Sequence, residues 1–197
     1  PLVLDELKKY DFRIIIILEK SDVETIESVK NYDCKIIHQQ NKGYGDALIE
    51  GINNTVTEYF CIFNADGSFN PIEIENMLKV AVNSKFDFVF ASRYQINSGS
   101  EDDTIVTYVG NKIFTFLGKI FFKLPITDIL YTFVIGNVHK AKQLNLSKRD
   151  FGFCVELPIK AKKFGMTLTS TSSYERKRIA GKKKVNAIKD GILILFS

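Results

Sequence analysis

Three oxygen-bearing side chains stand at alternate positions in the segment Asn64-Ala65-Asp66-Gly67-Ser68. The apolar run 59–63 before it is typical of a buried strand, so the segment begins where a strand ends. Alternate side chains of an extended chain point to the same side, and Mg²⁺ or Mn²⁺ binds such oxygens while water and phosphate complete its shell. The segment therefore predicts a metal site that holds a diphosphate, although an acidic residue followed by Gly-Ser is also typical of a plain turn.

Other polar residues follow neighbouring apolar runs. Arg93 stands two residues after the run 86–91, where it could bind a phosphate with paired donors or simply flank a strand. Asp128 could act as a general base toward a hydroxyl substrate, or it could cap a loop or helix. Gly43 and Gly45 enclose a turn in which backbone can approach a phosphate or sugar closely, and a purely structural turn fits them equally well.

The net charge of +4 conceals an asymmetry. Residues 160–190 hold ten Lys or Arg against two acids, whereas the rest of the chain holds 17 against 21. Such a basic segment indicates an anionic partner, or else a solvated basic face. The residues that could close over a diphosphate or bind an acceptor phosphate are Arg176, Arg178, Lys182, Lys183 and Lys184.

Alternating strands and helices must position these residues. Apolar runs predict strands at 12–18, 35–38, 59–63, 86–91 and 166–172, with a strand-like piece from 126 to 135. Helices are expected at 22–31, opened by a Ser21-to-Glu24 capping box, around 47–52, and at 71–83, 110–122, 154–164 and from 187 onward. Short βα spacing favours an α/β fold with a mostly parallel sheet, and the run 12–18 is of the kind buried on both faces. In such sheets ligands bind at the carboxyl ends of the strands.

Composition limits the number of domains, the kind of metal site and the class of partner that can be expected. With 197 residues, 45% hydrophobic and 25% charged, residues 1–197 suit a single globular domain. With only two histidines, and three cysteines that lack CxxC spacing, a zinc site is not expected, so any metal should be a hard, oxygen-bound one. The scattered cysteines are typical of free thiols in a reducing compartment. No apolar stretch approaches the roughly 20 residues of a membrane span, and no signal peptide is recognisable. No interleaved aromatic residues accompany the basic segment, so nucleic acid is not expected as a partner.

Taken in order, these motifs resemble the family-2 glycosyltransferases, in particular the branch that contains dolichol-phosphate mannosyltransferase and bacterial polyprenyl-phosphate sugar transferases. That family carries an Asn-x-Gly-x-Gly-x-Ala-Leu segment, an Asp-x-Asp metal motif, a Gly-Ser-Arg-Tyr segment and an Arg-rich closing segment. The matching segments here are Asn41-Lys42-Gly43-Tyr44-Gly45-Asp46-Ala47-Leu48, Asn64-Ala65-Asp66-Gly67-Ser68, Ala91-Ser92-Arg93-Tyr94, Gly110-Asn111, Thr127-Asp128 and Tyr174-Glu175-Arg176-Lys177-Arg178.

The resemblance implies a Rossmann-like GT-A fold and a metal-assisted transfer, with inversion, of a hexose from a UDP- or GDP-sugar to an acceptor, a polyprenyl phosphate or a glycan. Asp66, with Asn64 and Ser68, would hold Mg²⁺ or Mn²⁺ and neutralise the leaving diphosphate. Arg93 and Asp128 would lie at the reaction centre. The implied donor-binding residues are Glu19, Asp22, Asn41, Gly43, Gly45 and Asp66. The basic segment and the apolar helix after it fit a cytoplasmic domain that rests on an anionic membrane face.

Several features depart from the family pattern. The family's first, nucleotide-binding strand has no counterpart, so the domain is expected to be truncated at its N-terminus relative to the family. Leu18-Glu19-Lys20-Ser21 stands where a pair of Asp usually precedes Gly-Ser, and Asn64 replaces the first acid of the metal motif. A degenerate anion-binding or interaction module is therefore an alternative. A sugar-phosphate nucleotidyltransferase is another, although its Gly-rich phosphate loop is not seen in this sequence.

Overall fold

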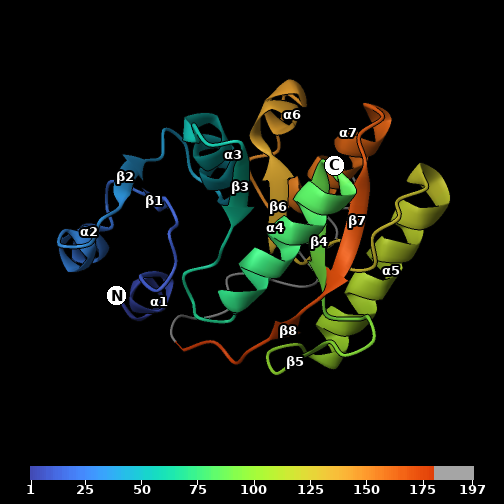
Figure 1. The fold of residues 1–197 in the computed structure, drawn as a ribbon, viewed down its shortest axis with the longest axis horizontal. Helices are drawn as coiled ribbons and strands as arrows, with labels where there is room; N and C mark the ends of the chain where they lie inside the picture. The colour runs from blue at the N-terminus through green and yellow to red at the C-terminus, as the bar shows by residue number, and fades with distance from the viewer. Residues whose placement is uncertain (180–197) are drawn as a thin grey trace.

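In a computed structural model that describes residues 1–179, strands and helices alternate along most of the chain (Figure 1). The strands are β1 (Ile15–Leu18), β2 (Lys35–His38), β3 (Tyr59–Ile62), β4 (Phe88–Ser92), β5 (Gly99–Ser100), β6 (Val134–Asn137), β7 (Leu168–Ser172) and β8 (Tyr174–Glu175). The helices are α1 (Leu2–Leu7), α2 (Val23–Val29), α3 (Tyr44–Asn54), α4 (Ile72–Ser84), α5 (Ile105–Phe122), α6 (Val138–Gln143) and α7 (Phe153–Lys163). Lys182, Lys183, Lys184 and the helix expected from residue 187 lie outside the described residues.

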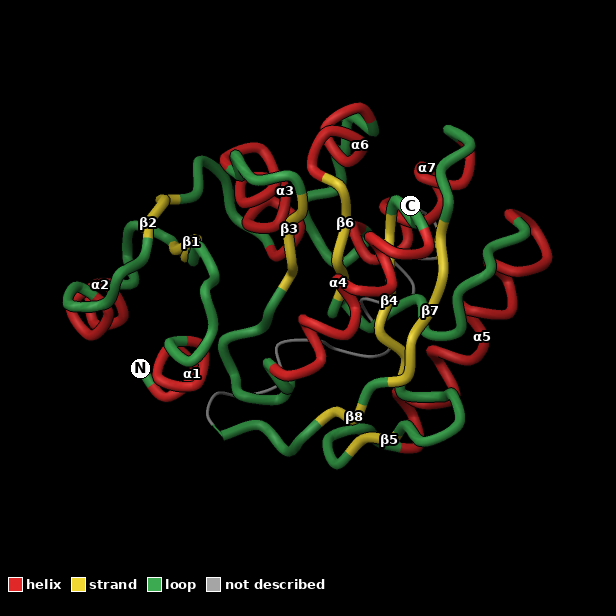
Figure 2. Tube along the Cα trace, viewed as in Figure 1, coloured by secondary structure: helices red, strands yellow, loops and turns green. Residues whose placement is uncertain are grey.

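The central sheet has the strand order β3-β6-β4-β7 (Figure 2). β4 and β7 are parallel, whereas β6 is antiparallel to both of its neighbours. The α/β class is as predicted, but one strand of the mostly parallel sheet is reversed. The segment 124–133 brings the chain back to the carboxyl end of β4, where the Ala91 N–H donates to the Phe133 carbonyl at 2.9 Å. β6 therefore starts beside the end of β4 and runs back along it.

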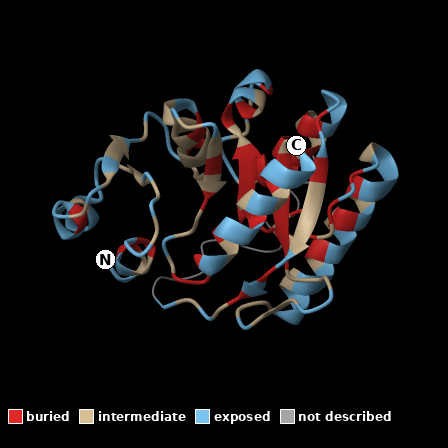
Figure 3. Ribbon diagram, viewed as in Figure 1, coloured by how far each residue is buried: buried red, intermediate tan, exposed pale blue. Residues whose placement is uncertain are grey.

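β1 and β2 form a separate parallel pair in which Ile15 lies opposite Lys35. Within residues 1–179 neither strand pairs with the central sheet, and Figure 1 shows the pair beside α1 and α2. The prediction that the run 12–18 is buried on both faces is wrong for β1. All four of its residues are half-buried, because this two-stranded sheet stands apart from the main core (Figure 3).

The core lies on both faces of the central sheet. Side chains alternate along β4, so that Phe88 and Phe90 join one apolar cluster while Val89 and Ala91 join the other. The first cluster is covered by α3, α6 and α7, and the second by α4. Figure 3 shows the two middle strands of the sheet, β4 and β6, as buried along most of their length. This rigid sheet fixes the strand ends that carry the polar motifs.

Helix α5 differs from the other helices in its exposure. It begins at Ile105, earlier than the predicted 110, because Thr104 and Thr107 form a reciprocal capping box. Its buried residues are Asn111, Thr115 and Gly118, whereas most of its large apolar side chains are exposed. Phe114 and Phe122 are the ones that pack against the core. Contrary to the expectation that no apolar stretch approaches a membrane span, this helix alone among the described residues has the length and composition of one, and only 17% of it is buried.

Candidate active site

The segment after β3 holds Asp66 in a tight turn. The Asp66 Oδ1 atom accepts hydrogen bonds from the Ser68 backbone N–H at 3.0 Å and from the Ser68 hydroxyl at 2.7 Å. Gly67 has φ +83°, a left-handed conformation that favours glycine. The Ser68 side chain is buried and holds Asp66 in place. One carboxylate oxygen of Asp66 is thus bound within the turn, and Oδ2 is the oxygen turned toward other groups.

Asn64 is held by a side chain of α3. Its amide oxygen accepts a hydrogen bond from the Tyr44 hydroxyl at 3.2 Å, and that hydroxyl also contacts the Thr132 hydroxyl at 2.6 Å. Burial raises the pKa of Tyr44, so the hydroxyl stays protonated and donates. Tyr44 lies at the start of α3. The sequence motifs around residues 44 and 64 therefore meet in space.

The donor set fits a hard divalent cation that substrate helps to bind. Residues 1–179 contain no cluster of three His, Cys, Asp or Glu side chains suited to a metal. Asp66 and Asn64 offer one carboxylate and one amide oxygen. Mg²⁺ and Mn²⁺ need few protein ligands when phosphate oxygens and water complete the shell. A bound diphosphate would therefore strengthen the binding of a metal here.

The chain after β8 crosses this turn as a strap, which we define as residues 176–179. The Arg176 N–H donates to the Ser68 carbonyl and the Ile179 N–H to the Asp66 carbonyl, both at 2.8 Å. The Arg178 guanidinium forms paired bonds to Asp102 at 3.1 and 2.8 Å, and its Nη1 lies 3.8 Å from Asp66 Oδ2. The predicted basic residue Arg178 thus reaches the predicted metal motif.

Arg176 is engaged elsewhere. Its guanidinium binds Glu6 at 3.2 and 2.8 Å, and it donates to the Phe69 carbonyl at 2.5 Å. These contacts fasten the strap to α1 and to the end of the Asp66 turn. Arg176 therefore anchors the strap, while Arg178 is the basic side chain beside Asp66.

Arg93 and Asp128 bind one another in a buried network. Asp128 accepts four hydrogen bonds: from the Arg93 backbone at 3.1 Å, from Arg93 Nε at 2.8 Å and Nη2 at 3.1 Å, and from the Asn111 amide. Arg93 Nη1 also donates to Glu175 at 3.1 Å. Burial alone would lower the pKa of Arg93, but Asp128 and Glu175 raise it. Asp128 is fully buried and its oxygens are occupied, which favours the structural alternative over a general base.

The turn before α3 packs against the loop 148–150. A Cβ at Gly43 would lie 2.1 Å from the Arg149 carbonyl oxygen, and one at Gly45 would lie 2.2 Å from that of Lys148. The buried Asp46 accepts from the Asn41 backbone and side chain, both at 3.3 Å, and lies 3.6 Å from Arg149. The close approach that the glycines permit is therefore to another loop of the fold, as the structural alternative expected.

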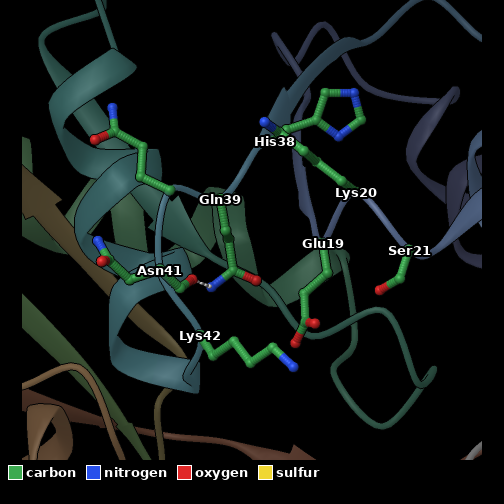
Figure 4. A pocket seen from close by; sticks show the side chains of 8 residues that line it. Glu19, Lys20, Ser21, His38, Gln39, Asn41 and Lys42 are labelled. Carbon is green, nitrogen blue, oxygen red and sulfur yellow. Dashed lines mark hydrogen bonds between the residues drawn. The ribbon is translucent and has the colours of Figure 1, made fainter.

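A cavity of about 520 Å³ opens at the carboxyl ends of β1 and β2 (Figure 4). It is lined by Glu19, Lys20, Ser21, His38, Gln39, Gln40, Asn41 and Lys42. Two predicted donor-binding residues, Glu19 and Asn41, thus line one cavity of a size typical of ligand sites. Gln39 donates to the Gly43 carbonyl at 2.9 Å and fixes the wall. Gln39 and Lys42 were not predicted as site residues. Gln39 directly follows the strand predicted at 35–38, the position that marks a ligand site in parallel sheets, and Lys42 lies three residues further on.

Asp22 stands beside this cavity without lining it. Its carboxylate accepts from the Glu19 backbone N–H at 3.2 Å. The capping box expected from Ser21 and Glu24 does not form, because the N-cap of α2 is Asp22, one residue later. The Asp22 side chain turns back toward Glu19 and makes no cap bond to the helix. Asp22 therefore shapes the Glu19 turn.

Known proteins resemble this chain in sequence and in fold. A family model described as Glycosyl transferase family 2 matches residues 2–144. The uncharacterized protein MJ1222 of Methanocaldococcus jannaschii is 23% identical over 172 residues, which cover 84% of this chain and 71% of that protein.

Solved structures of glucosyl-3-phosphoglycerate synthase from Mycobacterium tuberculosis share the fold. The complex with Mn²⁺ and UDP-glucose has a TM-score of 0.74 at 12% identity and covers 98% of this chain and 72% of that one. The complex with Mn²⁺, UDP and glucosyl-3-phosphoglycerate has a TM-score of 0.74 at 11% identity, with 98% and 71% covered. At such identities the likeness establishes the fold alone.

Proposed function

The chain belongs to glycosyl transferase family 2, and from this membership we propose that it transfers a hexose from a UDP- or GDP-sugar to a polyprenyl phosphate at an anionic membrane surface. The observation that carries the donor half is Asp66, held at the end of β3 with Arg178 beside it. The acceptor half rests on the outward face of α5. The branch of polyprenyl-phosphate sugar transferases is likewise part of the proposal.

The donor would lie along the carboxyl ends of β1, β2 and β3. Glu19 and Asn41 would contact the nucleoside or sugar in the cavity, and the diphosphate would reach Asp66 and Arg178. A bound Mg²⁺ or Mn²⁺ would neutralise charge on the leaving diphosphate. The structures of glucosyl-3-phosphoglycerate synthase with Mn²⁺ and UDP-glucose, or with Mg²⁺ and UDP, support this choice of ligands.

A phosphate acceptor suits the state of Asp128. A hydroxyl acceptor needs a base to take its proton, and that carboxylate is buried and occupied by four donors. A phosphate monoester is already ionised near neutral pH and attacks without such a base. The Arg93–Asp128–Glu175 network then serves to position the ends of β4 and β8.

The outward face of α5 supports a membrane acceptor. Ile105, Val109, Ile113, Phe116 and Ile120 recur at the spacing of one helix face, and each is about half exposed or more. Contiguous apolar surface of this kind marks an interaction site. Lys112, Lys119 and Lys123 are exposed along one border of the face, where they would meet anionic headgroups.

The opposite face of α5 is bound to the domain. Asn111 donates to Asp128, and the Thr115 hydroxyl accepts from the Ile129 N–H at 3.2 Å. A helix fixed to the protein along one side can lie in the membrane interface but cannot cross the bilayer. We therefore propose a peripheral, cytoplasmic-face association, with α5 parallel to the membrane plane.

Vesicle binding tests the membrane half. Ile113 and Phe116 are 53% and 60% exposed, so Ile113→Glu with Phe116→Glu should leave the fold intact. Val56→Glu, at an 83% exposed position between α3 and β3, is the matched control. The α5 double variant should bind vesicles of phosphatidylcholine and phosphatidylglycerol more weakly by about tenfold or more. Equal binding by all three proteins would remove α5 from the proposal.

Ligand-induced stabilisation tests the donor half. UDP or GDP with Mn²⁺ should raise the melting temperature of the protein, because ligand binds only the folded state. Asp66→Ala should abolish the shift, whereas Asp33→Ala, at an exposed carboxylate before β2, should retain it. If neither nucleotide with metal stabilises the unaltered protein, the alternative of a degenerate, non-catalytic module replaces the proposal. Transfer to 3-phosphoglycerate instead of polyprenyl phosphate would correct the acceptor alone.

A further inference from the structure

The strap is packed directly on the metal motif. Its two backbone hydrogen bonds end on the carbonyls of Asp66 and Ser68. A Cβ at Gly67 would lie 2.5 Å from the Ile179 side chain, so the strap leaves no room for a side chain at the turn. Strap and metal motif therefore form one structural unit, although they are far apart in the sequence.

Within this unit Arg178 lies between two carboxylates. Asp102 binds its guanidinium in a paired, planar geometry that holds the group firmly. The guanidinium approaches Asp66 through Nη1, 3.8 Å from Oδ2. The side chains of Arg178 and Asp66 are only 22% and 23% exposed, so water screens this contact incompletely.

The same oxygen of Asp66 is the one a metal would need. Oδ1 is bound by the Ser68 N–H and hydroxyl, which leaves Oδ2 as the oxygen open to a cation. Asn64 contributes no charge, so Asp66 must attract the metal alone. A guanidinium and a divalent cation beside one carboxylate oxygen repel each other.

We propose that Arg178, anchored on Asp102, is the resident cation of the metal site and that metal binding displaces its Nη1 from Asp66 toward the donor diphosphate. Asp102 is then a positioning residue that keeps the guanidinium within reach of both partners. This inference rests on the proposed function, because it assumes that metal and nucleotide bind at Asp66. No bond is made or broken in the exchange.

The proposal predicts opposite effects with and without nucleotide. Without nucleotide, removing the Arg178 charge removes a competitor, so metal should bind more tightly. With UDP present, the same change removes a group that contacts the diphosphate, so the metal–nucleotide complex should weaken. A residue with a merely structural role would shift both affinities in the same direction or neither.

Mn²⁺ binding measured from the electron paramagnetic resonance signal of the free ion tests this directly. Arg178→Gln should bind Mn²⁺ more tightly than the unaltered protein without nucleotide, on the order of fivefold, and more weakly with UDP. Lys177→Gln, which removes a charge from an exposed neighbour on the same strap, should change neither affinity. If Arg178→Gln does not fold, Arg178→Lys serves instead, because it keeps a charge but loses the paired bond to Asp102. It should tighten Mn²⁺ binding without nucleotide and weaken it with UDP, as Arg178→Gln does, but by smaller factors.

The possible results distinguish a failure of the Arg178 proposal from a failure of the proposed function. Unchanged or weaker nucleotide-free Mn²⁺ binding in the Arg178 variants, while the unaltered protein binds Mn²⁺ with UDP, overturns the inference about Arg178 alone. Failure of the unaltered protein to bind Mn²⁺ even with UDP overturns the proposed function and the inference with it.

Discussion

Replacing Asp128 with alanine should greatly lower the free energy of unfolding of this protein. The same variant tests whether Asp128 has a structural or a catalytic role. Asp128 is fully buried and holds Arg93 and Asn111 through four hydrogen bonds. The alanine variant would leave the Arg93 guanidinium, 11% exposed, with Glu175 as its remaining carboxylate. The Asp128 carboxylate, which joins Arg93 at the end of β4 to Asn111 within α5, would be lost.

The size of the expected stability loss follows from the burial of the Arg93–Asp128 ion pair. Removing one partner of a buried ion pair costs about 3–5 kcal/mol, because the other charge is left without full compensation. Domains of ordinary size are stable by only about 5–15 kcal/mol. Asp128→Ala should therefore remove a large share of the free energy of unfolding. Glu175 retains one bond to Arg93, which places the expected value toward the lower end of the range.

Urea unfolding followed by circular dichroism measures the change. Glu27→Ala breaks an exposed ion pair with Lys30 and is the matched control, with an expected loss below about 1 kcal/mol. Transferase activity, compared at a temperature where both proteins are folded, separates the two roles of Asp128. Wild-type stability combined with abolished activity would refute the structural role and restore Asp128 as a general base.

Further predictions concern packing and pH. Gly45→Ala should destabilise the protein by about 1–3 kcal/mol in urea unfolding, because its Cβ would meet the Lys148 carbonyl at 2.2 Å. Gly110→Ala, where nothing lies within 4 Å, should instead stabilise α5 by about 0.5–1 kcal/mol, and equal effects of the two changes would contradict the packing. Burial alone would raise the pKa of Glu156, but hydrogen bonds from Lys160 and from the loop before α7 lower it. The contribution of the ionised Glu156 carboxylate to the free energy of unfolding should therefore be complete above pH about 4.3 and should fall as the pH drops further. Urea unfolding of Glu156→Gln from neutral to acid pH should show a smaller decrease in stability than the unaltered protein.

Local pattern predicted much of the fold. The strands at residues 35–38 and 59–62 and the helix α7 follow from apolar periodicity that their final environment reinforces. The start of α5 was missed because its cap is a pair of threonines and not the usual Ser/Thr with Glu. The reversed strand β6 could not be read from its own residues, since its direction depends on where the segment 124–133 returns to the sheet.

Individual site residues were predictable from the sequence, but the ion pairs between them were not. Asp66 and Arg93 were both expected at strand ends, and they lie there. That Arg93 binds Asp128 and Glu175, and that Arg178 reaches Asp102 and Asp66, depends on contacts between residues 35 to 112 positions apart. Charge pairing over such separations is set by the fold. Sequence pattern alone therefore indicated which residues carry charge but not which charge neutralises which.

The most direct test of the account is sugar transfer itself. Purified protein, Mn²⁺, a polyprenyl phosphate and either UDP-hexoses or GDP-hexoses would be incubated and the glycosylated lipid phosphate measured by mass spectrometry. We expect a metal-dependent product with one donor class. Asp66→Ala should lose at least about a hundredfold in activity, comparable to the loss of a group that stabilises charge in the transition state. Full activity of Asp66→Ala, or transfer that persists unchanged in chelator, would contradict it.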